Sequence, residues 1–427
     1  MKVIFDATVL GNIAKKNISR SGIFFSAYNL FLEMLQNENF EVLLYCDIKS
    51  LYALKKYSQS DDKLRDIQNI FLYSKPNQWV SYGFYLRSLF FPKNIVQMFF
   101  AKSFTLMLLI LKKIFSVFDT LALDKDEYYV FFSPMEKIPQ IFKDNDRIIK
   151  FTLLHDLIPI VCEGYFVSKK SWFYQLFNSL NSEDYYFANS VYTKEDFIKH
   201  CPQIDPHKIS VAHLGVNENF YPDKNERKNH LIREKYHIPK DKKYIFSLCS
   251  IEPRKNVIFI VENFIEFIKQ NEIQDVVFVL AGGHWEEFIQ KLEDKIHNLG
   301  VYKNKIIRAG YVDDGDLSNL YSHSLCSVYL SVYEGFGLPA LEAMSCGAPL
   351  IASNVTSIPE VVGDGGILIS PSDSLALKEA FKKIYLDSSF AQELSLKGIN
   401  QAKKFSWKKC VQEMAERMKA VLESKCL

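Results

Sequence analysis

Short β-rich runs alternate with longer helical stretches along most of this chain. Such alternation favours parallel sheets covered by helices, because two parallel strands can be joined only by a long crossover connection. The runs form two sets, separated by a polar, lysine-rich stretch at 221–243 that is typical of a connection between domains. The predicted strands are 2–6, 40–47, 128–133, 148–155, 185–190 and 209–214 in the first set, and 244–249, 276–281, 306–309, 327–331 and 349–353 in the second.

A chain of 427 residues is too long for a single hydrophobic core. We therefore predict an α/β protein with two Rossmann-like, doubly wound domains that face each other across a central cleft. The first domain spans 1–218 and the second 219–407. Ligands in such folds bind beyond the carboxyl ends of the strands, so the cleft is the expected site.

Charge and cysteine usage exclude several classes of protein. The 52 lysines and arginines nearly balance the 50 acids, which argues against bulk electrostatic binding of nucleic acid. The eight cysteines show no CxxC pair and no zinc-like spacing, as expected for reduced thiols in the cytoplasm. The N-terminal MKVIFDATVL resembles a first strand, not a signal peptide.

The stretch at 77–120 differs from the rest, because it is rich in large apolar residues and has five cations and no acid between Arg87 and Lys113. One interpretation is an amphipathic segment in peripheral contact with an anionic membrane. The other is a long helix packed on the first domain, with its lysines reaching into water. Its longest uncharged apolar run, 104–111, is shorter than the roughly 20 residues needed to span a bilayer.

The stretch SVYEGFGLPALEAMSCGAPLIASN, residues 331–354, places Glu334 and Glu342 on either side of a glycine-rich turn that opens a helix. Gly335 and Gly337 let the backbone approach a ligand closely. The free N–H groups and the dipole at the helix start form an anion site. Like charges repel, so the two carboxylates serve better as acceptors for hydroxyl groups on either side of that anion. Such an arrangement suits a nucleotide sugar.

This stretch resembles the E-x7-E motif of the retaining GT-B glycosyltransferases of family four. Other segments also resemble that family: SIEPRKN (250–256), LAGG (280–283), RAGYVDDGDL (308–317), HDLIPI (155–160), ANSVYTKEDF (188–197) and HLGVNENFYP (213–222). The resemblance implies a GT-B fold, with an N-terminal domain for the acceptor and a C-terminal domain for the nucleotide-sugar donor. It also implies that a helix at about 408–427 returns to the first domain. Nothing between residues 48 and 125 resembles the family.

The resemblance also implies roles for individual residues. Glu334 would accept hydrogen bonds from the donor sugar, and Glu342 from the ribose. Lys255 would neutralise the diphosphate, while His155 would lie near the donor sugar. The remaining candidate donor-binding residues are Gly22, Arg254, Val312, Asp313, Gly335, Phe336, Gly337 and Leu338.

Two of these positions carry specific expectations. The family often has an arginine six residues before the motif's lysine, but here that position is Cys249, so Arg254 is the other candidate cation. Asp313 would accept from both N–H groups of a guanine, whereas uracil offers one, and this favours a GDP sugar.

The resemblance implies a retaining glycosyltransferase that moves a hexose to an oligosaccharide acceptor in bacterial surface polysaccharide synthesis. HDLIPI and the base loop look most like mannosyl- or related deoxyhexosyl-transferases, which favours mannose from GDP-mannose and a lipid-linked acceptor, with a soluble acceptor as the alternative. The enzyme would work in the cytoplasm, on the inner face of the membrane. We expect no cofactor and no obligatory metal ion, because Lys255 and the helix start would neutralise the diphosphate. Two alternatives stay open: a nucleotide-sugar epimerase of the same shape, and a non-catalytic subunit that stabilises a partner enzyme.

Overall fold

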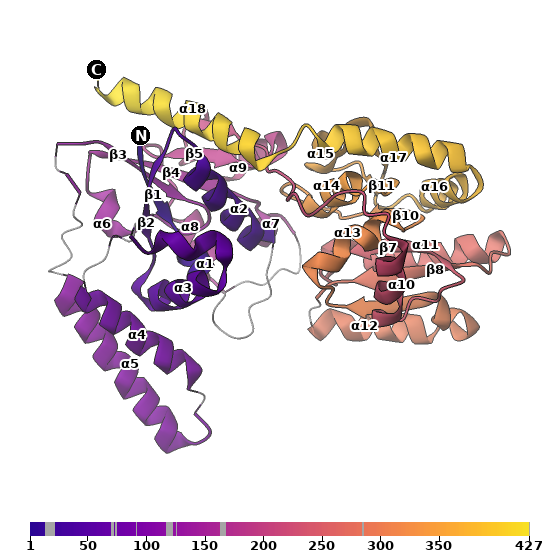
Figure 1. Cartoon of the computed structure of the whole chain (residues 1–427), viewed down its shortest axis with the longest axis horizontal. Helices are drawn as coiled ribbons and strands as arrows, with labels where there is room; N and C mark the ends of the chain where they lie inside the picture. Colours follow the sequence, from indigo (N-terminus) through magenta and orange to yellow (C-terminus); the bar gives the residue numbers. More distant parts are fainter. Residues whose placement is uncertain are drawn as a thin grey trace.

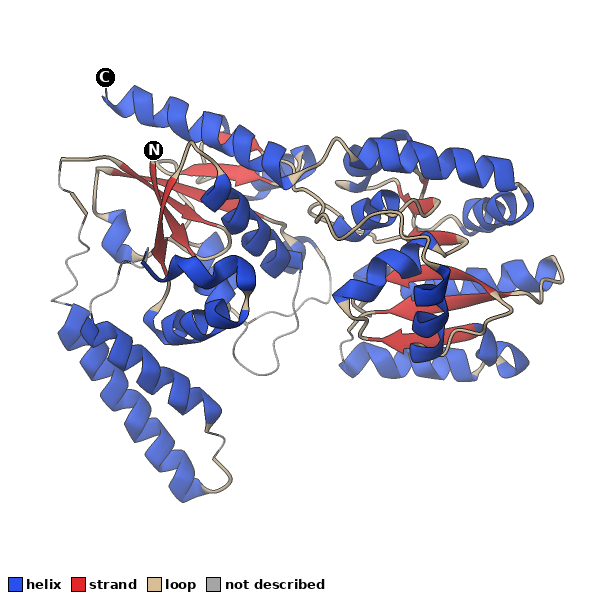
Figure 2. Cartoon of the chain, viewed as in Figure 1, coloured by secondary structure: helices blue, strands red, loops and turns tan. Residues whose placement is uncertain are grey.

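The computed structural model describes residues 1–12, 22–69, 72, 75–90, 92–116, 123–124, 126–162, 168–283 and 286–426. It contains two six-stranded sheets, each flanked by helices (Figures 1 and 2). Every strand pair in both sheets is parallel. The predicted α/β class with two doubly wound sheets is therefore confirmed.

The first sheet has the order β2-β1-β3-β4-β5-β6, and the second β12-β11-β10-β7-β8-β9. The strands are β1 (Lys2–Asp6), β2 (Glu41–Tyr45), β3 (Tyr129–Ser133), β4 (Ile148–Leu154), β5 (Tyr185–Ala188), β6 (Ile209–Val211), β7 (Lys243–Leu248), β8 (Val276–Ala281), β9 (Ile306–Gly310), β10 (Cys326–Tyr329), β11 (Leu350–Ser353) and β12 (Ile367–Ile369).

The central strands are buried along their length, as expected for strands covered on both faces. All residues of β3, β8, β10 and β11 are buried. In the second sheet the strand order reverses between β7 and β10. Ligands of open α/β sheets bind at such a reversal, beyond the carboxyl ends of the strands.

The longer helices cover these sheets and connect their strands. They are α2 (Gly22–Gln36), α3 (Ile48–Ser60), α4 (Lys75–Leu89), α5 (Ile95–Ser116), α9 (Val191–His200), α10 (Glu226–Lys235), α11 (Val257–Gln270), α12 (Glu286–His297), α13 (Asp314–Ser322), α14 (Leu338–Ser345), α16 (Ser374–Leu386), α17 (Ser388–Ala402) and α18 (Trp407–Cys426). Shorter helices are α1 (Thr8–Asn12), α6 (Gln140–Lys143), α7 (Ile158–Val161), α8 (Trp172–Phe177) and α15 (Ile358–Val362).

Three regions differ from the expectations or extend them. The stretch 221–243 is not only a connection, because it contains α10, which packs on α13 of the second domain. The short strand β12 was not predicted. At the C-terminus, α18 crosses back and packs on α2 of the first domain (Figure 1).

Helices α4 and α5 form a hairpin that projects from the first domain (Figure 1). Its base is anchored, since Val80, Phe84 and Leu108 share a small buried cluster with Ile48 of α3. The expectation that nothing at 77–120 is long enough to span a membrane was wrong. Within the described residues, Ile95–Phe115 is apolar and long enough by length and composition, with a mean hydropathy of 1.6 and 11% of it buried.

Candidate active site

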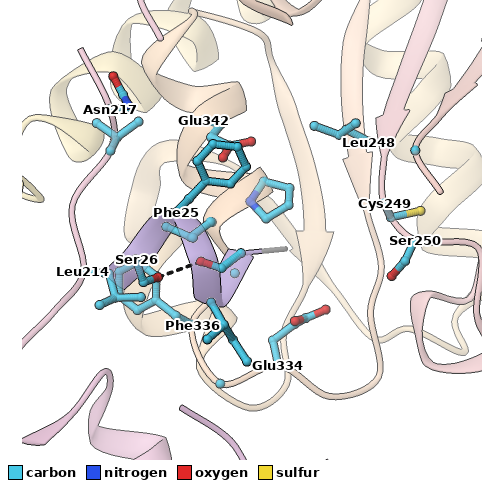
Figure 3. Close-up of a pocket in the computed structure, with 18 of the residues that line it drawn as sticks. Phe25, Ser26, Leu214, Asn217, Leu248, Cys249, Ser250, Glu334, Phe336 and Glu342 are labelled. Atoms are coloured by element: carbon cyan, nitrogen blue, oxygen red, sulfur yellow. Dashed lines mark hydrogen bonds between the residues drawn. The ribbon is translucent and has the colours of Figure 1, made fainter. Parts of the chain in front are cut away.

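A cavity of ≈ 540 Å³ lies between the two domains. The first domain contributes α2, the loop after β4 and residues 214–217, and the second contributes the loops after β7, β9 and β10 and the start of α14. Figure 3 shows Phe25 and Ser26 of α2 on one side, and Leu248, Cys249 and Ser250, at the end of β7, on the other. The candidate residues that line this cavity are Gly22, His155, Arg254, Lys255, Val312, Glu334, Gly335, Phe336, Gly337, Leu338 and Glu342.

Glu334, in the loop after β10, is held by two cations. Lys255 Nζ donates to its Oε1 at 2.5 Å, and Arg254 Nη1 donates to the same oxygen at 2.6 Å. Burial alone would raise the pKa of Glu334, but these two cations lower it to about 2. The carboxylate is therefore ionised at neutral pH although it is buried.

The two cations have further partners in the second domain. Arg254 Nη2 lies 2.7 Å from Glu252 Oε1, and Lys255 Nζ donates to the hydroxyl of Tyr329 at 2.7 Å. Arg254 Nε is buried and has no hydrogen-bond partner among the described residues.

The position where the resemblance expects an arginine is occupied by a buried thiol. Burial raises the pKa of Cys249 to about 11, so the group is neutral and cannot replace a cation. The second positive charge comes from Arg254, whose guanidinium turns toward Glu334.

Glu342 has the opposite electrostatic environment. It lies on α14, and burial, with a smaller contribution from the nearby Asp314, raises its pKa to about 8. The two glutamates of the motif therefore differ in charge at neutral pH, with Glu334 ionised and Glu342 largely protonated.

The start of α14 faces the cavity. Gly337 is the N-cap residue, with φ +99°, a conformation that favours glycine. A Cβ built on Gly22 would lie 3.7 Å from Leu338 Cδ1, so α2 and α14 begin beside each other. Free backbone N–H groups and the positive end of the α14 dipole thus point into the space between the domains.

The loop after β10 is also bound to the first domain. Ser190 Oγ and Thr193 Oγ1 donate to the carbonyl of Gly335 at 2.7 and 3.0 Å. The hydroxyl of Tyr333 donates to Asp196 at 2.5 Å. Sequence reasoning did not single out these residues, although Ser190 and Thr193 lie in the ANSVYTKEDF segment. A serine just before a helix is a common N-cap, and Ser190 is the N-cap of α9.

Glu360, at the start of α15, makes a second contact between the domains. Its carboxylate accepts from the backbone N–H of Val191 at 2.9 Å and pairs with His213. Glu360 therefore stabilises the start of α9 in the first domain, which is a structural role.

His155 and Asp156 follow β4 and form the polar part of the first-domain wall. His155 Nε2 donates to the carbonyl of Pro134 at 2.6 Å, which leaves Nδ1 as an acceptor. Burial lowers the pKa of His155 to about 4 and raises that of Asp156 to about 6. Asp156 Oδ1 also accepts from the N–H of Ile158 at 3.1 Å, a turn-capping bond.

The structure does not bring Asp313 into the cavity. Its carboxylate is 63% exposed and binds Lys235 of α10 at 2.5 Å. Asp314, the next residue, lines the cavity instead, together with the buried Val312. The expectation that the Asp313 side chain faces the nucleotide site was therefore wrong, because Lys235 of α10 binds this side chain outside the cavity.

Comparisons with known proteins agree with this architecture. The family model "Glycosyl transferases group 1" matches residues 228–405. O-antigen chain mannosyltransferase B of Escherichia coli is 30% identical over 263 residues, which cover 61% of this chain and 67% of that protein. The serotype-specific mannosyltransferase WbdA of E. coli is 28% identical over 273 residues, or 63% of this chain. The matched region spans only about a third of WbdA (33%).

The crystal structure of Anabaena Alr3699/HepE, in complex with UDP and glucose, superposes with a TM-score of 0.66 at 17% identity, covering 98% of this chain and 100% of that one. This likeness confirms the GT-B fold. The chain belongs to the family of group 1 glycosyl transferases, as its motifs predicted.

Proposed function

We propose that this chain is a retaining hexosyltransferase that moves mannose from GDP-mannose to a lipid-linked oligosaccharide in bacterial surface polysaccharide synthesis. Membership of the family supports glycosyl transfer, and the names of its E. coli relatives support mannose and a surface polysaccharide. The acceptor would be presented at the inner face of the cytoplasmic membrane, where the protein would work from the cytoplasm.

One observation carries the proposal: a buried group of two cations and a carboxylate lies beside the start of α14 in the interdomain cavity. Lys255, Arg254 and the α14 N–H groups supply positive charge for a diphosphate. Glu334 supplies an acceptor for sugar hydroxyls next to it. Charges that are already placed and ordered cost little reorganisation when the leaving group becomes negative.

In the proposed reaction, an acceptor hydroxyl oxygen bonds to the anomeric carbon as the bond from that carbon to the diphosphate oxygen breaks. The acceptor enters on the face from which the diphosphate leaves, so configuration is retained. The hydroxyl proton passes to the departing phosphate oxygen. Lys255 and Arg254 stabilise the diphosphate, and closure of the domains excludes water that would hydrolyse the donor.

His155 takes part as a neutral group. Because its Nε2–H is used by Pro134, Nδ1 is the atom that can accept a hydrogen bond from the donor sugar. Because its pKa is lowered, His155 is neutral and adds no positive charge beside the anomeric carbon, where positive charge develops in the transition state.

For the base, Asp314 takes the place that we expected for Asp313. It is the acidic side chain after β9 that lines the cavity, and a carboxylate there can accept from both N–H groups of a guanine. We propose that no metal ion is obligatory, because two cations and a helix start already face the diphosphate site. Transfer in the presence of a strong chelator should therefore continue, and its loss on chelation would contradict this.

A thermal-shift panel of nucleotide sugars tests the donor assignment. At a hundredfold excess over its dissociation constant, a bound donor adds about 2.7 kcal/mol to the free energy of unfolding. We expect GDP-mannose and GDP to raise the melting temperature and UDP sugars to leave it unchanged. A shift with UDP sugars alone would reject the GDP assignment.

Product analysis with donor alone separates transfer from epimerisation. A transferase should leave GDP-mannose intact or hydrolyse it slowly, and should form a glycoside only when an acceptor is added. Release of an epimerised free sugar without any acceptor would identify an epimerase, and donor binding without either product would favour a non-catalytic subunit.

A further inference from the structure

The α4–α5 hairpin exposes a continuous group of large apolar side chains. Near its tip, Ile95 is 79% exposed, and Phe99 and Phe100 are 69% and 67% exposed. Exposed apolar patches of this kind mark contact surfaces. The exposed apolar residues of α5 are Ile95, Val96, Met98, Phe99, Phe100, Phe104, Leu106, Met107, Leu109, Ile110 and Ile114.

These residues are arranged around α5 in an ordered way. At 100° per residue, nine of them, all but Met98 and Leu109, fall within an arc of about half the helix circumference. Ala101 and Leu108 are buried on the other side, where α5 packs on α4. The exposed Lys102 and Lys113 lie at the edge of the apolar arc, about 20° apart. A wide apolar face with cations along its edge is typical of a helix that lies in a lipid headgroup region.

The charge of the hairpin identifies what covers this face. Between Lys75 and Ser116 the sequence has six cations and no acid. A second copy of the chain would bring these cations against one another, whereas anionic lipid complements them.

The arginine in the hairpin is already paired internally. Arg87 Nε donates to the carbonyl of Ala101 and to Thr105, at 3.1 and 3.2 Å, and Nη1 donates to the carbonyl of Phe90 at 3.1 Å. Pairing with backbone carbonyls is how a charged group is tolerated next to hydrocarbon.

We propose that the α4–α5 hairpin docks on an anionic lipid surface, with the apolar arc of α5 in the outer acyl region of one leaflet. Its axis runs along the membrane, because Lys93 at the tip and Lys102 near mid-helix then both reach the phosphate level. The anchored base, where Ser81 Oγ accepts from the N–H of Tyr52, keeps α4 on the first domain. This surface does not depend on the transfer chemistry of the cavity.

Flotation of the full chain with vesicles tests the proposal. We expect it to float with vesicles of phosphatidylcholine and phosphatidylglycerol, and much less with phosphatidylcholine alone. Phe99→Ser with Phe100→Ser should abolish flotation. Lys93→Gln with Lys102→Gln should weaken binding to the anionic vesicles by about twenty-five-fold, since each lysine near the surface contributes about fivefold.

Leu375→Ser with Leu396→Ser is the matched control. These two leucines are 68% and 62% exposed, but they lie on α16 and α17 of the second domain, and the variant should float like the parent. Failure of the parent to bind anionic vesicles overturns the proposal, as does a dimer in light scattering that only the phenylalanine variant dissociates.

Two readouts separate the remaining possibilities. A tryptophan placed by Phe100→Trp should be quenched by lipids brominated near the headgroup more strongly than by those brominated at the chain end. The reverse order would mean that the hairpin is inserted across the bilayer and would overturn the in-plane arrangement. Transfer to a water-soluble acceptor should be unchanged in the hairpin variants, so loss of lipid binding and loss of catalysis are distinguishable.

Discussion

The two walls of the interdomain cavity use polar groups differently. On the second-domain wall, Arg254 and Lys255 both donate to the ionised Glu334, at 2.6 and 2.5 Å. On the first-domain wall, burial shifts the pKa of His155 down and that of Asp156 up, which moves both toward their uncharged forms. A diphosphate is charged and sugar hydroxyls are neutral, so under the proposed function the charged wall suits the diphosphate and the first-domain wall suits sugar hydroxyls. The difference teaches that the buried cations gather on the second-domain wall, while His155 on the first-domain wall stays neutral.

The strongest way to break this contrast is Glu334→Gln. Loss of the carboxylate leaves two buried cations with one partner fewer, so we expect transfer to fall by about a hundredfold or more. Removing one partner of a buried pair also destabilises a protein by about 3–5 kcal/mol. Initial rates and denaturant unfolding measure the two effects.

Glu252→Gln is the control for that variant. It removes a buried carboxylate from the same Arg254 side chain, but Glu252 does not line the cavity. It should lose comparable stability and retain most activity. Equal loss of activity in both variants would show that Glu334 acts only through stability.

The second prediction alters the contact between the walls. A Cβ on Gly335 would lie 1.9 Å from the carbonyl oxygen of His155, so Gly335→Ala must push the walls apart. We expect it to cost about 1–3 kcal/mol and to lower transfer severalfold. Gly315→Ala, where nothing lies within 4 Å of the new Cβ, should leave activity unchanged. Normal activity in Gly335→Ala would mean that the close approach is not needed.

The third prediction, with the smallest expected effect on transfer, is a pH dependence of stability that arises from Glu342 on the second-domain wall. Because the pKa of Glu342 is raised to about 8, the folded state holds a proton that the unfolded state loses near pH 4.5. Below pH 4.5 both states are protonated and Glu342 costs the folded state nothing. The free energy of unfolding then falls as the pH rises from 4.5 to 8. In Glu342→Gln, melting temperatures should decline less over that range than in the parent. Parallel curves would contradict the raised pKa.

Much of the fold was readable because buried parallel strands leave continuous apolar runs, such as VVFVLA in β8. β12 was missed because three residues, ILI, are too short to show a period. For the α4–α5 hairpin, the sequence predicted the composition but not the arrangement. Its composition was evident, but the separation into two helices that project from the domain depends on which side chains find partners in α3.

Where a motif fixes the residues, as with Glu334 and Lys255, the sequence predicted which side chains line the cavity, and their roles in catalysis stay predictions. The direction of Arg254 was not readable, since it lies on a single 3₁₀ turn, Pro253–Lys255, followed by Asn256 with φ +60°. The choice between Asp313 and Asp314 depended on Lys235, a residue distant in the sequence. Sequence patterns identify residue types in a loop, but long-range pairing decides which of two neighbours points inward.

The return of α18 to the first domain joins the two halves of the molecule a second time. Val216, on the way out, and Ser406, on the way back, pair as neighbouring extended segments, and Gly215 lies too close to Trp407 for any Cβ. Two chain crossings that lie side by side leave a single axis for bending and resist twisting. We therefore expect the two domains to bend about this pair of crossings more readily than they twist around it.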